Sequence, residues 1–167
     1  MLVLGIDPGY AIVGYGILDY RCSRFMPVCY GAITTPAGME FDRRLEIIYQ
    51  DLDLVMKKYR PDAMAIEQLF FTTNQKTAIS VAQARGVILL CARQNQMETV
   101  EYTPLQVKQS VVGYGKAAKS QVMEMTRQLL NLKEIPKPDD TADALAIAIC
   151  HCHSAGSRIN LKKLQMK

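Results

Sequence analysis

MLVLGIDPGY, residues 1–10, joins a run of apolar residues to one carboxylate, Asp7, and then breaks at Pro8 and Gly9. A short apolar run that ends at a turn signal is typical of a buried central strand. Asp7 would then lie at the carboxyl end of that strand, where open α/β sheets bind their ligands. Alone, this acid is compatible with nucleotide binding, metal binding or no function, so the rest of the chain has to decide between them.

The length and composition fit one globular domain. A chain of 167 residues, 49% of them hydrophobic and 22% charged, can bury a single compact core. We expect this domain to span residues 1–156, followed by a basic, frayed tail over residues 157–167. The net charge of +4 permits a polyanionic partner, but it is equally compatible with a role in solubility.

Two features bear on the cellular compartment. No apolar run approaches the roughly 20 residues that a membrane span requires, and the N-terminus lacks the regions of a signal peptide. The cysteines form an odd set, mostly inside apolar segments, which favours reduced thiols over a disulfide framework: Cys22, Cys29, Cys91, Cys150 and Cys152. We therefore expect a soluble, cytoplasmic protein.

The hydrophobic pattern predicts an α/β domain. Residues 41–59 repeat apolar side chains at three- and four-residue spacing, which is typical of an amphipathic helix, and Pro61 ends it. Strands are expected at residues 2–7, 11–20, 26–34, 63–67 and 98–102. Further helices are expected at residues 74–94, from 104, at 118–130 and from about 139. Since the first three strands form a meander and the others alternate with helices, the five-stranded sheet should mix antiparallel and parallel pairs.

Carboxylates recur at the ends of these elements. Glu67 ends its strand as Asp7 ends the first one, and Asp140 and Asp143 lie one turn apart on one face of the last helix. If these four side chains converge, they repel one another unless cations lie between them, and oxygen ligands favour Mg²⁺ or Mn²⁺ over zinc. Two such ions, about 4 Å apart, can activate a water molecule and stabilise the leaving oxygen of a phosphodiester.

Each acid also has a simpler explanation. Acids at strand ends are often exposed residues that begin a loop, and acids at a helix start often act as caps that complement the helix dipole. We assign Asp139 to capping, whereas the spacing of Asp140 and Asp143 suits capping and metal binding equally. Only the complete set of four acids favours a metal site.

Five stretches follow one another along the chain: GIDPG at residues 5–9, IEQLFF at 66–71, QARG at 83–86, VKQSVVGYGKAAKSQV at 107–122 and DDTADALAIAICH at 139–151. In order and spacing they resemble the motifs of the RuvC family of crossover junction endodeoxyribonucleases. The resemblance covers essentially the whole chain, and several of the matching stretches are long.

The resemblance implies a ribonuclease H-like fold in a homodimer that cuts Holliday junctions symmetrically, in two strands of like polarity. It implies bacterial recombination and repair alongside the branch-migration proteins RuvA and RuvB. The nicks would carry 5′-phosphate and 3′-hydroxyl ends that a ligase can seal. Mg²⁺, with Mn²⁺ as a substitute, would be the cofactor, with two ions in each active site.

The resemblance also implies roles for individual residues. The acids that match the family's metal ligands and catalytic residues are Asp7, Glu67, Asp140 and Asp143, with water attacking the phosphorus directly. Some relatives carry histidine at the position of Asp140, so this residue is either a ligand or an activator of water.

Several residues near these acids are candidates for DNA binding. Lys108, Lys116 and Lys119 flank a Gly-Tyr-Gly loop and suit contacts to phosphates, although three lysines more often form a solvated surface. Phe70 follows Glu67 by three residues and could stack on or wedge between bases, as the resemblance supports. Arg85 is a further candidate for a phosphate or interface contact.

Two other segments invite an interpretation. The helix at residues 74–94 is too apolar for a solvated helix, so we expect part of it, around Gly86, to form the dimer interface. The run from Cys150 to His153 contains residue types that bind zinc, but it lacks the separated ligand pairs of a structural zinc site, so we expect helix and core there.

Two alternative functions stay open. Actin-like kinases and ATPases also place an acid on a first hairpin, where it serves a nucleotide-bound metal, but they require two related halves and a second glycine-rich phosphate loop. The other alternative is a junction-binding module that has lost hydrolysis, which the intact set of acids disfavours.

Overall fold

A five-stranded sheet forms the centre of the protein. In the computed structural model, the backbone is described for residues 1–69 and 75–165 and the side chains for residues 1–69 and 77–155. The strands are β1 (Leu2–Asp7), β2 (Ile12–Arg21), β3 (Arg24–Thr34), β4 (Ala63–Glu67) and β5 (Glu98–Tyr102). Their order is β3-β2-β1-β4-β5, with antiparallel pairs among β1, β2 and β3 and parallel pairs among β1, β4 and β5. The predicted mixed five-stranded α/β sheet is confirmed.

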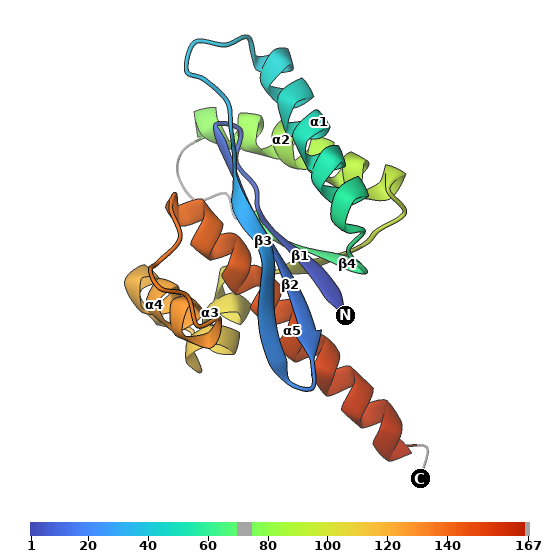
Figure 1. Cartoon of the computed structure of the whole chain (residues 1–167). Coiled ribbons are helices and arrows are strands. Elements are labelled where there is room, and N and C mark those ends of the chain that lie inside the picture. The colour runs from blue at the N-terminus through green and yellow to red at the C-terminus, as the bar shows by residue number, and fades with distance from the viewer. Residues whose placement is uncertain (70–74, 166–167) are drawn as a thin grey trace.

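Helices cover both faces of this sheet (Figure 1). One face carries α1 (Phe41–Tyr59) and α2 (Gln75–Gln94). The other carries α5 (Asp139–Gln165), with α3 (Pro104–Val112) and α4 (Lys119–Leu129) packed beside it. Along β1 the side chains alternate between the two layers: Val3 joins the core on the α5 side, and Leu4 and Ile6 join the core under α1 and α2.

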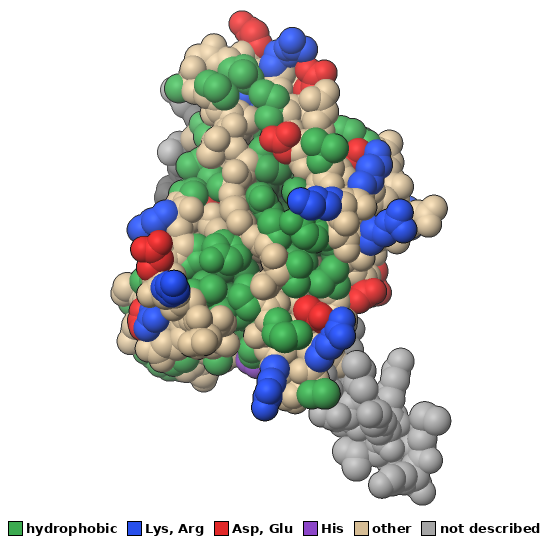
Figure 2. All heavy atoms as spheres, viewed as in Figure 1, with side chains coloured by type: hydrophobic (Ala, Val, Ile, Leu, Met, Phe, Trp, Pro, Cys, Tyr) green, Lys and Arg blue, Asp and Glu red, His purple; other side chains and the backbone are tan. Residues whose placement is uncertain are grey.

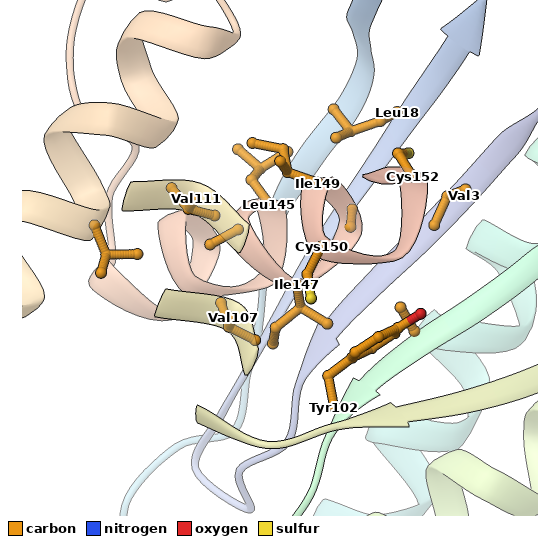
Figure 3. Close-up of a cluster of buried hydrophobic side chains, with 14 of the residues drawn as sticks. Val3, Leu18, Tyr102, Val107, Val111, Leu145, Ile147, Ile149, Cys150 and Cys152 are labelled. Atoms are coloured by element: carbon orange, nitrogen blue, oxygen red, sulfur yellow. The ribbon is translucent and has the colours of Figure 1, made fainter. Parts of the chain in front are cut away.

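The core on the α5 side fixes the last helix against the sheet. Figure 3 shows its side chains converging from the strands, from α3 and from α5, and those labelled include Val3, Leu18, Val107, Val111, Leu145 and Ile149. Residues Ala142 to Cys152 of α5 are almost all buried, which is unusual for a helix on the outside of a sheet. The start of α5 is therefore held at a defined place over the strands.

Several boundaries differ from the predicted ones. The strands β2 and β3 extend to Arg21 and from Arg24, beyond the expected ends at residues 20 and 26. They do so because Cys22 and Ser23, with φ of 49° and 62°, form a two-residue turn, and two positive φ values match the twist of a hairpin. Similarly, α5 continues to Gln165 and so runs through most of the expected tail at residues 157–167. The division into a domain and a tail stays a prediction.

None of the helices in the described ranges combines the length and the hydropathy that crossing a membrane requires.

Candidate metal and nucleic-acid site

The alternation of side chains along β1 and β4 brings two acids to one place. Ile6 of β1 pairs with Ile66 of β4, so Asp7 and Glu67 lie at the next step, at the ends of neighbouring parallel strands. Residues two positions apart share a face, and Val3 and Ala65 belong to the core on the α5 side. Both carboxylates therefore face the layer that contains α5.

The first turn of α5 supplies Asp140 and Asp143, and two glycines let this turn approach the sheet. A Cβ atom on Gly14, which pairs with Asp7, would lie 2.0 Å from the backbone oxygen of Asp140. A Cβ atom on Gly5 would lie 2.1 Å from the backbone oxygen of Ala144. Any other residue at these positions would push the helix away from the strand end that carries Asp7.

The electrostatics of Asp7 show that the four acids lie close enough to affect one another. Burial raises the pKa of Asp7 to about 8, and the negative charges of Glu67, Asp143 and Asp140 contribute to this shift. Burial also raises the pKa of Glu67, with a contribution from Asp143. The strand ends and the helix start thus bring half-buried carboxylates close enough to raise the pKa of Asp7.

A lysine at the start of α4 reaches into this cluster. The Nζ atom of Lys119 lies 2.8 Å from Oδ2 of Asp143 and 4.0 Å from Oδ2 of Asp139. Burial raises the pKa of Asp143, and the positive charge of Lys119 counteracts part of this rise. The same charge also counteracts part of the rise in the pKa of Asp7 and of Glu67. Asp139 additionally pairs with Lys137 at 2.8 Å, outside the cluster. Lys119 therefore supplies positive charge to several of these acids at once.

A cavity of about 240 Å³ opens beside the acids, between α3, α4 and α5. Its lining combines two acids and two lysines with aliphatic side chains. The lining residues are Glu67, Pro104, Val107, Lys108, Lys119, Val122, Asp143 and Ile147. Two ammonium groups next to two carboxylates suit a phosphodiester whose negative charge the lysines neutralise.

The donor chemistry of the cluster fits a hard divalent cation. Carboxylate oxygens are the ligands that Mg²⁺ and Mn²⁺ prefer, and a cation would relieve the repulsion that raises the pKa of Asp7. Within residues 1–69 and 77–155, no three histidine, cysteine, aspartate or glutamate side chains form a group that could hold one ion together. Asp143 instead pairs with Lys119.

The other predicted DNA-binding residues do not all lie at the cavity. Lys108 lies in the cavity, and Lys116 is exposed on the loop between α3 and α4 but does not line the cavity. Arg85 is only 15% exposed, and its Nη2 atom lies 2.7 Å from Oε1 of Glu101, an ion pair without the geometry of a directed hydrogen bond. Phe70 lies outside the described residues.

Charge is scattered on the face that Figure 2 shows. Lysine and arginine side chains alternate with acidic ones around the outline, and hydrophobic side chains gather along the middle. This view contains no broad basic patch, so the lysines beside the carboxylates are the positive groups best placed to bind a nucleic acid.

The run from Cys150 to His153 turns its side chains in different directions. His151 shares a buried hydrogen bond of 3.1 Å with the hydroxyl of Tyr102, whereas Cys150 and Cys152 are buried in the core. His153 shares a hydrogen bond of 3.0 Å with Ser110. These contacts belong to the packing of α5 against β5 and α3.

Sequence reasoning missed the roles of Gly5, Gly14 and the pair between Lys119 and Asp143. Glycine inside an apolar strand signals a close backbone approach, so both glycines offered a usable clue. No comparable signal links Lys119 to Asp143, because the contact joins two helices that the fold alone brings together.

Comparison with known proteins agrees with this geometry. The family model described as "Crossover junction endodeoxyribonuclease RuvC" matches residues 3–151. Proteins of that name from Clostridioides difficile and Alkaliphilus oremlandii are 56% and 58% identical to this chain. The alignments cover 98% of this chain and 97% of the first relative, and 92% of this chain and 94% of the second.

Solved structures give the same result. Thermus thermophilus RuvC in complex with a Holliday junction substrate superposes with a TM-score of 0.88 at 35% identity, covering 93% of this chain and 94% of that one. The yeast mitochondrial Holliday junction resolvase Ydc2, at 14% identity and a TM-score of 0.63, covers 90% of this chain and 78% of its own and shares the fold. The predicted ribonuclease H-like fold is confirmed. The chain belongs to the RuvC family of crossover junction endodeoxyribonucleases.

Proposed function

We propose that this chain resolves Holliday junctions as a structure-selective, metal-dependent endonuclease. It cuts two strands of like polarity symmetrically and leaves 5′-phosphate and 3′-hydroxyl ends that a ligase can seal, in DNA recombination and repair. The observation that carries this proposal is the gathering of Asp7, Glu67, Asp140 and Asp143 beside a cavity with two lysines. Family membership supports the same chemistry, and the junction in the Thermus thermophilus complex supports the substrate class.

The four acids are the proposed holders of the cofactor, which we assign as two Mg²⁺ ions with Mn²⁺ as a possible substitute. Bound there, the cations would supply Lewis-acid chemistry at the phosphorus and at the leaving oxygen. Asp7 and Glu67 approach from rigid strand ends and Asp143 from a buried helix, so all three have positions that packing fixes. Asp140 is the fourth, either as a ligand or by orienting the attacking water.

The proposed DNA contacts surround these acids. Lys108 and Lys119 would hold the phosphates at the cavity, and Lys116 would hold a neighbouring phosphate from its exposed loop. Arg85 would act from α2, where its guanidinium is paired with Glu101 of β5. Phe70, which precedes α2 in the sequence, would wedge between bases at the junction.

We propose a homodimer that meets through α2. The exposed residues Ile79, Gln83, Gly86 and Leu90 are spaced by four, three and four positions, so they form one stripe along this helix. Ile79 is 66% exposed and Leu90 is 53% exposed, and nothing lies within 4 Å of a Cβ built on Gly86. A stripe with two large apolar side chains and a glycine suits a self-complementary contact between two copies.

Further partners and the location follow from the family. We propose that the dimer works with the branch-migration proteins RuvA and RuvB in the bacterial cytoplasm, as the bacterial relatives suggest. Residues 1–156 would be the nuclease domain and residues 157–167 a tail beyond it.

One assay tests the proposed function against its alternatives. The wild type, Asp7→Asn and the exposed control Asp51→Asn are incubated with a mobile four-way junction, linear duplex DNA or ATP, in Mg²⁺, Mn²⁺ or EDTA. We expect paired symmetric nicks in the junction only with metal and only when Asp7 is present, while Asp7→Asn still binds the junction. ATP hydrolysis without cutting would support the actin-like alternative, and binding without cutting by the wild type would support a non-catalytic module.

A further inference from the structure

Lys119 occupies a place among the acids that suits a cation. Its ammonium group lies 2.8 Å from Asp143 and 4.0 Å from Asp139, and its charge also reaches Asp7 and Glu67. An ammonium that donates to a carboxylate oxygen uses a lone pair that a metal ion would need. The lysine and a divalent cation therefore compete for the same oxygen of Asp143.

The position of Lys119 is unfavourable for the helix that carries it. Lys119 is the first residue of α4, and the first turn of this helix contains no acidic residue. Because the N-terminus of a helix carries a partial positive charge, a lysine there destabilises the helix slightly. Helix formation thus gives no reason for this lysine, whereas the carboxylate cluster in front of it does.

The side chain of Lys119 can also leave the cluster at low cost. It is 57% exposed, whereas Asp143 is 27% exposed, so the lysine reaches inward from the solvent side along a flexible stem. Ion pairs with one partner exposed to this extent contribute little to stability, so a divalent cation can outweigh this one. Lys119 also lines the cavity next to Lys108, so a released ammonium group remains within that cavity.

We propose that Lys119 is an internal counter-ion that holds Asp143 until a divalent cation displaces it, and that the freed ammonium group then binds a DNA phosphate at the cavity. This inference rests on the proposed metal site. It makes metal loading and phosphate binding mutually favourable, because a bound cation frees the lysine that the phosphate needs, and a bound phosphate draws the lysine away from the carboxylate that the cation needs.

Calorimetric titration of the protein with Mn²⁺, without DNA, tests this exchange. We expect Lys119→Met to bind Mn²⁺ about two- to fivefold more tightly than the wild type, the factor that corresponds to losing one exposed ion pair. Lys119→Arg keeps the pair and should retain the affinity of the wild type. Lys108→Met is the matched control, because Lys108 lines the same cavity and its charge reaches Glu67, so its effect reports the general loss of a charge.

Titration with Mg²⁺, followed through the NMR signals of the lysine ammonium groups, gives a second readout. The signal that Lys119→Met removes should shift as Mg²⁺ is added, and the signal of Lys108 should shift less. If Lys119→Met binds Mn²⁺ no more tightly than the wild type, or if Lys108→Met gains as much, the inference is wrong. If the wild type and Asp7→Asn bind Mn²⁺ equally weakly, it is the proposed metal site itself that fails.

Discussion

The carboxyl group of Asp7 has a pKa of about 8 because burial and three neighbouring acids disfavour its charged form. In the unfolded chain the pKa of Asp7 returns to 3.8. Between pH 3.8 and about pH 8, folding of the metal-free protein is therefore coupled to the uptake of a proton by Asp7. A pKa that is raised in the folded state contributes stability that is complete below pH 3.8 and is lost as the pH rises towards 8. The contribution of Asp7 to the stability of the metal-free protein is therefore lost towards pH 8, where its carboxylate would be free to bind the proposed cation.

Asp7→Asn should consequently stabilise the metal-free protein. The amide has no charge to bury, so we expect the unfolding temperature in EDTA at pH 7.5 to rise by about 3 °C or more, the shift that 1 kcal/mol gives in a domain of this size. The difference from the wild type should shrink towards pH 4. Thermal unfolding followed by circular dichroism checks this, with Asp51→Asn as an exposed control. An unchanged or lower unfolding temperature for Asp7→Asn would contradict the cause we assign to the raised pKa.

The thiols provide an independent test of burial at the scale of single residues. Burial raises the pKa of Cys91 and Cys150 to about 11 and that of Cys152 to about 12, whereas Cys22 is exposed in the β2–β3 turn. At pH 8 the three buried groups are almost entirely protonated, and the thiolate is the form that reacts. We expect a thiol reagent at pH 8 to label Cys22 rapidly and these three only after denaturation, and Cys22→Ser to remove the rapid phase. Rapid labelling of Cys150 or Cys152 would show that α5 opens.

At the scale of elements, the site depends on how closely α5 approaches β1 and β2. Gly14→Ala would place a methyl group 2.0 Å from the backbone oxygen of Asp140, which a side-chain rotation cannot relieve. We expect the start of α5 to move outward, weakening Mn²⁺ binding at least about tenfold, with a stability loss of about 1–3 kcal/mol. Calorimetry and thermal unfolding measure both effects.

Gly31→Ala is the matched control for this substitution. It also adds a methyl group to a strand glycine, but the nearest atoms belong to the side chain of Tyr15, 3.0 Å away. This side chain can adjust, so Mn²⁺ affinity should stay within about twofold of the wild type. Equal losses in Gly14→Ala and Gly31→Ala would mean that the close approach of α5 does not position the acids.

Elements with clear breakers could be predicted from the sequence. The bounds of β1, β4, β5 and α1 agree with the predicted ranges. Pro8, Pro61 and Pro104 closely follow β1, α1 and β5 and end the regular pattern there. The β2–β3 turn was misjudged because Cys22 and Ser23 are not residues that signal a tight turn. The pair between Lys119 and Asp143 depends on the relative position of α4 and α5, which local patterns do not encode.

At the scale of the whole molecule, the candidate site draws on segments that are far apart in the sequence. Asp7, Glu67 and the pair Asp140 and Asp143 come from the first strand, the fourth strand and the last helix, and the sheet order places β1 beside β4. One such site would cut one strand. Symmetric resolution of a four-way junction needs two sites in a fixed relation, so the proposed dimer is a requirement of the mechanism.

The stripe on α2 should therefore control both assembly and the pairing of cuts. Ile79→Asp combined with Leu90→Asp places two charges on this exposed apolar face, and we expect the protein to become monomeric in light scattering after size-exclusion chromatography. Since neither residue is in the described site, each monomer should still bind Mn²⁺ like the wild type, but on a junction it should produce single, uncoordinated nicks. Leu54→Asp on α1 is the control, because Leu54 is 65% exposed and lies outside the stripe. If the double variant stays dimeric, or if Leu54→Asp dissociates the protein equally, the two copies meet through a surface other than this face of α2.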